Sequence, residues 1–304
     1  MLHGWLILDK PRGLGSTQAV SAVKRALRQA GEPKTKVGHG GTLDPLAEGV
    51  LPIALGEATK LAGRMLDASK IYEFTIGFGV QTDTLDMEGV VVAESEVRPT
   101  FAEVEAVLPQ FTGPIEQIPP AYSAILIDGK RAYDLARAGE AVEMKTRSVT
   151  IHSLVTLPTG EGPLDSITLT AHVSKGTYIR SLARDIALAL GTVGHVTMLR
   201  RTKAGPFTLA TAISLDNLTD AARERSIAQH MLPLTAGLDD IPAFAVTADQ
   251  AAALQQGRTL IGTAATPGLH LAILGDIPVA LVEADDREIR VVRGFNLMSK
   301  EEDR

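Results

Sequence analysis

The chain has 304 residues, of which 45% are hydrophobic and 22% charged, a composition typical of a globular protein with one large domain or a large and a small one. It contains no cysteine, which excludes disulfides, thiolate nucleophiles and cysteine metal sites. No apolar run approaches the roughly 20 residues of a membrane span, and the N-terminus resembles a first strand more than a signal peptide, so we expect a cytoplasmic protein. The formal net charge of −6 disfavours indiscriminate nucleic-acid binding, which would therefore have to rest on particular basic residues.

Hydrophobic periodicity and turn residues predict alternating runs of strands and helices. Strands are expected at residues 4–11, 50–56, 71–80, 90–97, 148–157, 166–174 and 195–207. Helices are expected at residues 16–31, where Ser16 and Thr17 suggest an N-terminal cap, and at 57–67, 100–111 and 177–190. Residues 119–140 indicate a strand, a glycine turn and a short helix. Strands often follow strands and no dinucleotide fingerprint follows the first one, so the fold class is α+β.

The pattern changes after about Ala236. A linker and one helix lead into short strands at close spacing, which is typical of a small β-rich accessory domain. We therefore expect a large domain in residues 1–236 and a small β-rich domain in residues 237–304.

The segment GHGGTLDPLAEGVLPIALG, residues 38–56, contains the first candidate site residue, Asp44. Asp before Pro is a good helix start, with the carboxylate as cap, but Gly49 and Pro52 follow too soon for more than about one turn. Glycines permit tight backbone geometry and the close approach of a ligand. An ionisable residue on such a loop is a candidate for catalysis.

Other chemistries are open for the same region. Asp44 and Glu48 could form a glycosidase pair of acid and nucleophile, although their separation cannot be read from the sequence. His39 could bind a metal, but no second histidine lies near it and the chain has no cysteine. The turn QTDTLDMEG at residues 81–89 has carboxylates but lacks the glutamate spacing of a calcium-binding EF-hand loop.

A second segment, SKGTYIRSLARDIALALG at residues 174–191, turns at Gly176 into a helix. Arg180 falls in the first turn of this helix, where the helix dipole favours an anion over a cation. Either Arg180 is solvated, or an anion lies near it, such as a phosphate or the carboxylate of Asp44. An Arg–carboxylate pair would keep Asp44 ionised and oriented in a dry pocket.

These two segments and three others resemble one known family. The blocks are KVGHGGTLDPLAEGVLPIALGEATK, KIYEFTIGFGVQTDTLDMEG, PPAYSAILIDGKRAYDLARAGE, SKGTYIRSLARDIALALG and HVTMLRRTKAGPF. In this order they resemble the bacterial TruB family of tRNA pseudouridine-55 synthases across most of the first 210 residues. The GTLDPLAEGVL stretch is the most specific, because it matches the family's catalytic signature. After about residue 210 the similarity is one of position and strand content.

The resemblance implies a pseudouridine synthase catalytic fold, a mixed and mainly antiparallel sheet with flanking helices, followed by a PUA-like domain. It also implies an RNA-contacting insertion around residues 110–145, with Lys130 and Arg131 on it. Such enzymes detach uracil from C1′ of one uridine in RNA, turn it and reattach it through C5, without cofactor or metal. The implied partner is the T-arm of tRNA, bound by a monomer without an obligatory protein partner.

The resemblance also assigns roles by position. Asp44 takes the place of the catalytic aspartate, and whether it attacks C1′, attacks C6 or assists the loss of a ribose proton stays open. Tyr72 matches the tyrosine that packs on the target base and is a candidate base toward the ribose. Tyr178 would bind the uridine, and Arg180 would pair with Asp44.

Three further positions are implied with alternative structural roles. His39 matches a histidine that fills the space left by the flipped nucleotide, and Leu199 would line the base pocket or belong to the core. Lys60 would contact RNA or serve the fold. Basic residues flank these blocks and could follow phosphates, namely Lys34, Lys36, Arg137, Arg200, Arg201 and Lys203.

Three rival functions are weighed against a uridine isomerase. A non-catalytic RNA-folding protein could keep the same scaffold, and the two activities could coexist, but a degenerate copy should have lost Asp44, Tyr72 or Arg180. A hydrolase using Asp44 and Glu48 would release a base or sugar. A guide-RNA-dependent relative would act in a larger particle, whereas the short N-terminus and the lack of basic tails favour the stand-alone bacterial type.

Overall fold

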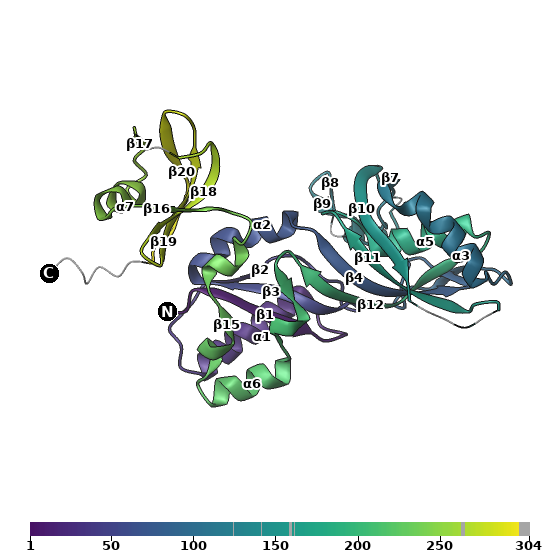
Figure 1. Ribbon diagram of the computed structural model, residues 1–304. Coiled ribbons are helices and arrows are strands. Elements are labelled where there is room, and N and C mark those ends of the chain that lie inside the picture. Colours follow the sequence, from purple (N-terminus) through teal and green to yellow (C-terminus); the bar gives the residue numbers. More distant parts are fainter. Residues whose placement is uncertain (124, 141, 158–159, 161, 263–264, 298–304) are drawn as a thin grey trace.

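The computed structural model describes residues 1–123, 125–140, 142–157, 160, 162–262 and 265–297. In this part of the chain an 11-stranded sheet runs through the large body (Figure 1). Its strands follow the order β14 (Ala212–Ile213), β1 (Gly4–Lys10), β3 (Glu48–Leu55), β12 (Gly194–Ala204), β4 (Lys70–Phe78), β11 (Ser166–Val173), β10 (Arg147–Thr156) and β7 (Gly113–Gln117). Three more pair at its sides, β2 (Val37–His39) with β3, β13 (Phe207–Thr208) with β12 and β15 (Met231–Leu232) with β1. Only β1–β14 and β3–β12 pair in parallel among these described strands, so the expected mixed, mainly antiparallel sheet is confirmed.

The helices and small hairpins surround this sheet. The α-helices are α1 (Ser16–Gln29), α2 (Ala62–Asp67), α3 (Phe101–Val107), α4 (Ala132–Arg137), α5 (Ile179–Ala189) and α6 (Leu215–Arg223). Short 3₁₀ helices are η1 (Gly56–Leu61), η2 (Leu108–Phe111), η3 (Leu209–Thr211), η4 (Ile227–His230) and η5 (Leu234–Gly237). Two hairpins stand apart from the main sheet, β5 (Val80–Thr82) with β6 (Val91–Glu94) and β8 (Leu126–Ile127) with β9 (Lys130–Arg131). The sequence predictions missed α6 and placed one helix where η1 and α2 follow each other.

Two buried apolar clusters meet at the middle of the sheet. One packs α3 and α5 against β4, β10 and β11, and the other packs α1 and α6 against β1 and β3. Tyr72 of β4 and Leu199 of β12 contact both clusters. These two side chains therefore lie where the two halves of the body join.

Ser16 does not cap α1, contrary to the sequence prediction. The N-cap is Gly15, whose N–H donates to the side chain of Gln18. The buried Ser16 Oγ instead donates to the carbonyl oxygen of Leu43 at 3.0 Å and accepts from its N–H at 2.8 Å. The first turn of α1 thus holds the backbone of the residue that precedes Asp44.

Gly49 shows why this segment needs glycine. Its φ is +98°, and a Cβ placed on it would lie 2.2 Å from the backbone oxygen of Arg201 on the neighbouring strand β12. We expect Gly49→Ala to lower the free energy of unfolding by roughly 3 kcal/mol, because backbone strain and displacement of β12 add together. Urea denaturation measures this change, and Gly38→Ala is the matched control, since its Cβ would meet no atom within 4 Å. Equal stability of the two variants would contradict the expectation.

The C-terminal residues form a second sheet at one end of the body (Figure 1). Its strands follow the order β16 (Ala243–Ala245), β18 (Gly268–Leu274), β19 (Ile277–Ala284), β20 (Glu288–Gly294) and β17 (Leu260–Ile261), next to α7 (Ala248–Gln255). Leu271, Leu281 and Phe295 of this unit share one apolar cluster with Trp5 of β1. A small β-rich C-terminal unit is therefore confirmed, while the boundary at residue 236 stays a prediction.

Candidate functional site

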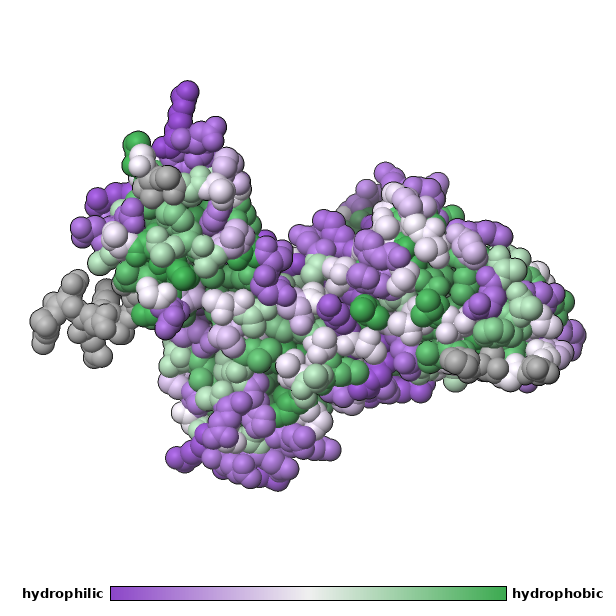
Figure 2. Space-filling view, in the orientation of Figure 1, coloured by the Kyte–Doolittle hydropathy of each residue, from purple (hydrophilic) through white to green (hydrophobic). Residues whose placement is uncertain are grey.

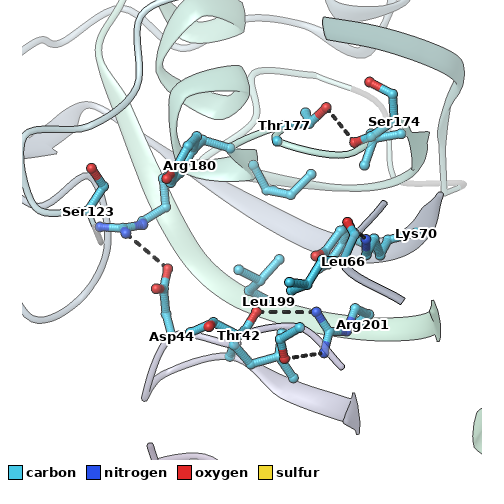
Figure 3. A pocket seen from close by; sticks show the side chains of 18 of the residues that line it. Thr42, Asp44, Leu66, Lys70, Ser123, Ser174, Thr177, Arg180, Leu199 and Arg201 are labelled. Carbon is cyan, nitrogen blue, oxygen red and sulfur yellow. Dashed lines mark hydrogen bonds and ion pairs between the residues drawn. The ribbon is translucent and has the colours of Figure 1, made fainter. Parts of the chain in front are cut away.

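A cavity of about 340 Å³ opens at the junction of the two halves of the body. Its walls come from the loop before β3, from β4 and β12, and from the turn that leads into α5 (Figure 3). The lining side chains include Asp44, Tyr72, Tyr178, Arg180 and Leu199, all predicted from sequence to share one site. Segments more than 130 residues apart along the chain therefore meet here.

Asp44 lies on a tight turn and not at a helix start. The N–H of Ala47 donates to the carbonyl oxygen of Asp44 at 3.0 Å, and β3 begins at the next residue. The carbonyl oxygen of Pro45 accepts from the N–H of Gly13 and from Nζ of the buried Lys10. These two hydrogen bonds fix the backbone of the turn, while the side chain of Asp44 lines the cavity and remains 41% exposed.

Arg180 forms the expected ion pair with Asp44. Its Nη2 lies 3.0 Å from Oδ2 of Asp44, and only 6% of its side chain is exposed (Figure 3). Nη1 donates to the carbonyl oxygen of Thr84 at 2.8 Å, and Nη2 donates to that of Tyr122 at 3.0 Å. The guanidinium is therefore held by two segments from outside α5 while it orients the carboxylate.

Asp86 is a member of this network that the sequence reasoning missed. Its Oδ2 lies 3.4 Å from Nη1 of Arg180, and its Oδ1 accepts from Thr84 Oγ1 and from the N–H of Glu88. The carboxylate is buried, so Arg180 balances one buried and one half-exposed carboxylate. The signal in the sequence is the carboxylate-rich turn at residues 81–89, which belongs to one of the five matching blocks but for which no site residue is predicted.

The apolar part of the cavity is built around Tyr72, Leu199 and Tyr178. Tyr72 lies beside Arg201 on β12 and Ala171 on β11 in the strand register. Tyr178 is fixed by Gln117, whose amide oxygen accepts from the N–H of Tyr178 and whose Nε2 donates to its carbonyl oxygen. Burial raises the pKa of Tyr178, so its hydroxyl stays protonated at neutral pH.

Two buried cations in the cavity wall also went unrecognised. Lys70, at the start of β4, has no predicted role, and Arg201 is predicted only as one of several basic residues that could follow phosphates. Arg201 is instead 1% exposed and donates to the carbonyl oxygens of Val50, Thr42 and Gly41. It thereby supports the loop that carries Asp44.

Other predicted site residues lie away from the cavity lining. His39, on β2, has a buried Nδ1 with no partner among the described residues, and burial lowers its pKa. Lys60 pairs with Glu57 at 2.6 Å and donates to the carbonyl oxygen of Gly294 at 2.9 Å, which supports its structural alternative. Lys130 and Arg131 form the exposed β9 within the predicted insertion, of which residues 124 and 141 lie outside the described residues.

Glu48 does not form a pair with Asp44 across the cavity. Its carboxylate binds Arg200 at 3.3 Å, and Arg200 also binds Asp9 at 2.8 Å. Arg200 is thereby committed to ion pairs within the fold. Across the described ranges, no group of three or more His, Asp or Glu is placed to hold a metal ion. None of the helices in those ranges has the length and apolar character needed to cross a bilayer.

Comparison with known proteins identifies the family. The model of the TruB family pseudouridylate synthase N-terminal domain matches residues 24–179, and that of the tRNA pseudouridylate synthase B C-terminal domain matches residues 180–239. The chain is 63% identical to tRNA pseudouridine synthase B of Novosphingobium aromaticivorans, with 98% of each chain covered. It is 62% identical to the protein of the same name from Zymomonas mobilis, with 97% of this chain and 96% of the relative covered.

Solved structures agree on the fold. An H/ACA RNP bound to a substrate RNA containing 2′-deoxyuridine includes a chain with a TM-score of 0.73 and 25% identity, with 98% of this chain and 86% of that chain covered. A Cbf5–Nop10–Gar1 complex gives a TM-score of 0.72 and 27% identity, with 97% and 85% covered. The chain therefore belongs to the TruB family of pseudouridylate synthases, the enzymes that convert uridine in tRNA to pseudouridine.

Proposed function

We propose that this enzyme isomerises the uridine at position 55 in the T-loop of tRNA, with Asp44 as the reacting carboxylate. The observation that carries the proposal is the Asp44–Arg180 pair at 3.0 Å, on the wall of a cavity that also has apolar sides. The guanidinium orients the carboxylate toward the cavity, and every candidate step of the reaction requires a positioned carboxylate. The volume of about 340 Å³ is in the range of small-ligand pockets and suits one flipped nucleoside.

The reaction breaks the bond from C1′ to N1, rotates the uracil and forms a bond from C1′ to C5. A proton leaves C5 and one is gained at N1, so the overall change is an isomerisation that needs no oxidant or energy source. Tyr72 and Leu199 offer apolar surfaces that would stack on the uracil and hold it while it turns. Tyr178 would bind the nucleoside from the turn before α5.

A hollow in the molecular surface supports tRNA as the substrate. Figure 2 shows a hollow between the C-terminal unit and the part of the body that carries β7–β11, and α2 lies at its floor in Figure 1. Leu66 of α2 lines the cavity and is half exposed, so the cavity opens beside this hollow. The exposed Lys130 and Arg131 of β9 would contact phosphates on one flank. We infer a monomer that acts in the cytoplasm, where tRNA is found, without a protein partner.

Unmodified tRNA incubated with the purified chain tests the proposal. We expect pseudouridine at position 55, detected by carbodiimide labelling and primer extension, and none elsewhere in the same tRNA. A tRNA with cytidine at position 55 is the control and should stay unmodified. Absence of pseudouridine, or its appearance only at another uridine, would overturn the proposed target.

A further inference from the structure

Lys70 is a buried cation in the cavity wall for which the reaction outlined above has no use. It is 7% exposed, and Nζ donates to the carbonyl oxygens of Leu66 at 2.7 Å and Ala68 at 2.5 Å. An ammonium has three N–H donors, so one has no acceptor among the described residues. Burial lowers the pKa of Lys70 to about 8, so the side chain is still mostly cationic at neutral pH.

Arg201 places a second positive charge beside Lys70. Three of its five N–H donors bind backbone carbonyl oxygens, and its charge is among the causes of the lowered pKa of Lys70. The ion pairs between described residues include neither side chain. The negative charge of Asp67 raises the pKa of Lys70, but the side chain of Asp67 is 67% exposed and forms its ion pair with Lys175.

The charges that line the cavity are therefore unbalanced. They comprise Asp44, Arg180, Lys70 and Arg201. Arg180 is paired with Asp44 and with the buried Asp86, whereas no ion pair between described residues includes Lys70 or Arg201. Buried cations without an anionic partner are unfavourable, and an arriving anion removes that cost. Lys10 is a useful contrast, because it is buried too and its pKa is likewise lowered to about 8, but its Nζ donates to three carbonyl oxygens, those of Pro11, Leu14 and Pro45.

A nucleotide within RNA brings such an anion. Uracil is neutral before the reaction, whereas each ribose is flanked by two phosphodiester groups. Figure 3 shows Lys70 and Arg201 on the side of the cavity across from Asp44, with Leu66 nearby. A nucleoside held with C1′ at Asp44 can therefore place one of its phosphodiester groups on that side.

We propose that Lys70, supported by Arg201, binds a phosphodiester that adjoins the target uridine. Lys70 donates its remaining N–H to a non-bridging oxygen of the phosphodiester. Arg201, which is buried in the protein, adds a second positive charge near that oxygen. This subsite rests on the proposed function, since it takes its ligand from a uridine held in the same cavity. It would draw the backbone of the flipped nucleotide inward and so fix the position of C1′ relative to Asp44.

A double-substitution cycle between protein and RNA tests the subsite. The RNA is a T-arm hairpin in which the linkage 5′ or 3′ to the target uridine is an uncharged methylphosphonate. The protein variant is Lys70→Gln, which keeps N–H donors for the carbonyl oxygens of Leu66 and Ala68 but removes the charge. For the wild type we expect one linkage to lower kcat/KM by roughly ten- to a hundredfold. With Lys70→Gln the same linkage should have little effect.

Lys24→Met, on the exposed face of α1, is the matched control and should keep the wild-type penalty. A penalty that is equal in the wild type and in Lys70→Gln would overturn the subsite, as would no penalty at either linkage in the wild type. The second outcome needs no variant, so it decides the matter even if Lys70→Gln fails to fold. Failure of the proposed function would differ from both, because the wild type would then form no pseudouridine in the unmodified hairpin.

Discussion

Replacing Asp44 with asparagine should lower the single-turnover rate of pseudouridine formation by about a thousandfold or more. The amide has nearly the same shape as the carboxylate, so it can occupy the turn before β3, but it carries no negative charge for any of the candidate steps. The ion pair with Arg180 at 3.0 Å would also be lost. Single-turnover assays with excess enzyme and tRNA labelled at C5 of uridine measure the rate directly.

Glu48→Gln is the matched control, because Glu48 lies four residues later and binds Arg200 instead of facing Asp44. It should retain activity within a few-fold of wild type. Asp44→Asn should still bind tRNA, because a carboxylate makes no favourable contact with phosphate groups and its removal leaves the basic residues unchanged. Full activity of Asp44→Asn, or loss of activity in Glu48→Gln alone, would contradict the assignment of Asp44.

Arg180→Ala should lower both catalysis and stability. Removing one partner of a buried ion pair leaves a carboxylate uncompensated, and we expect roughly 3 kcal/mol of lost unfolding free energy, the lower end of the usual range, because Asp44 is partly exposed. We expect the single-turnover rate to fall by roughly a hundredfold or more, since the orientation of Asp44 depends on the guanidinium. Urea denaturation and single-turnover assays give the two quantities separately.

Arg184→Ala controls for the loss of an arginine from the same helix. Arg184 lies one turn further along α5 and binds Asp185 and the carbonyl oxygen of Ile118, outside the cavity lining. It should leave the rate nearly unchanged. If Arg180→Ala bound tRNA much more weakly but reacted at the wild-type rate, Arg180 would serve a phosphate and not Asp44.

The sequence supported the pairing of Asp44 and Arg180 because each residue was locally out of place. Asp44 sits on a glycine-rich loop, which suggests a functional role, and Arg180 opposes a helix dipole, which suggests a nearby anion such as Asp44. Asp86 escaped notice because its turn already explained its presence, as Asp is a common turn residue. Its burial against Arg180 depends on the packing of α5, which no local pattern records.

Arg201 illustrates a different limit. In the stretch MLRRTKAGPF, the adjacent Arg200 and Arg201 look alike, and both are predicted as basic residues that could follow phosphates. Neighbouring residues of a strand point to opposite faces, so Arg200 reaches Asp9 and Glu48 while Arg201 enters the protein beneath the Asp44 loop. Strand alternation could have separated the two roles, but only tertiary structure reveals which face is buried.

The hydrogen bonds from Arg180 to two backbone carbonyl oxygens affect how much of the binding energy with tRNA is available to extrude the target base. Because Thr84 and Tyr122 already hold the guanidinium, no rotamer freedom of this long side chain remains to be lost when a nucleotide enters. Extruding a stacked base from folded RNA costs a few kcal/mol. A site that is ordered in advance leaves more of the favourable contact energy with tRNA available to drive that extrusion.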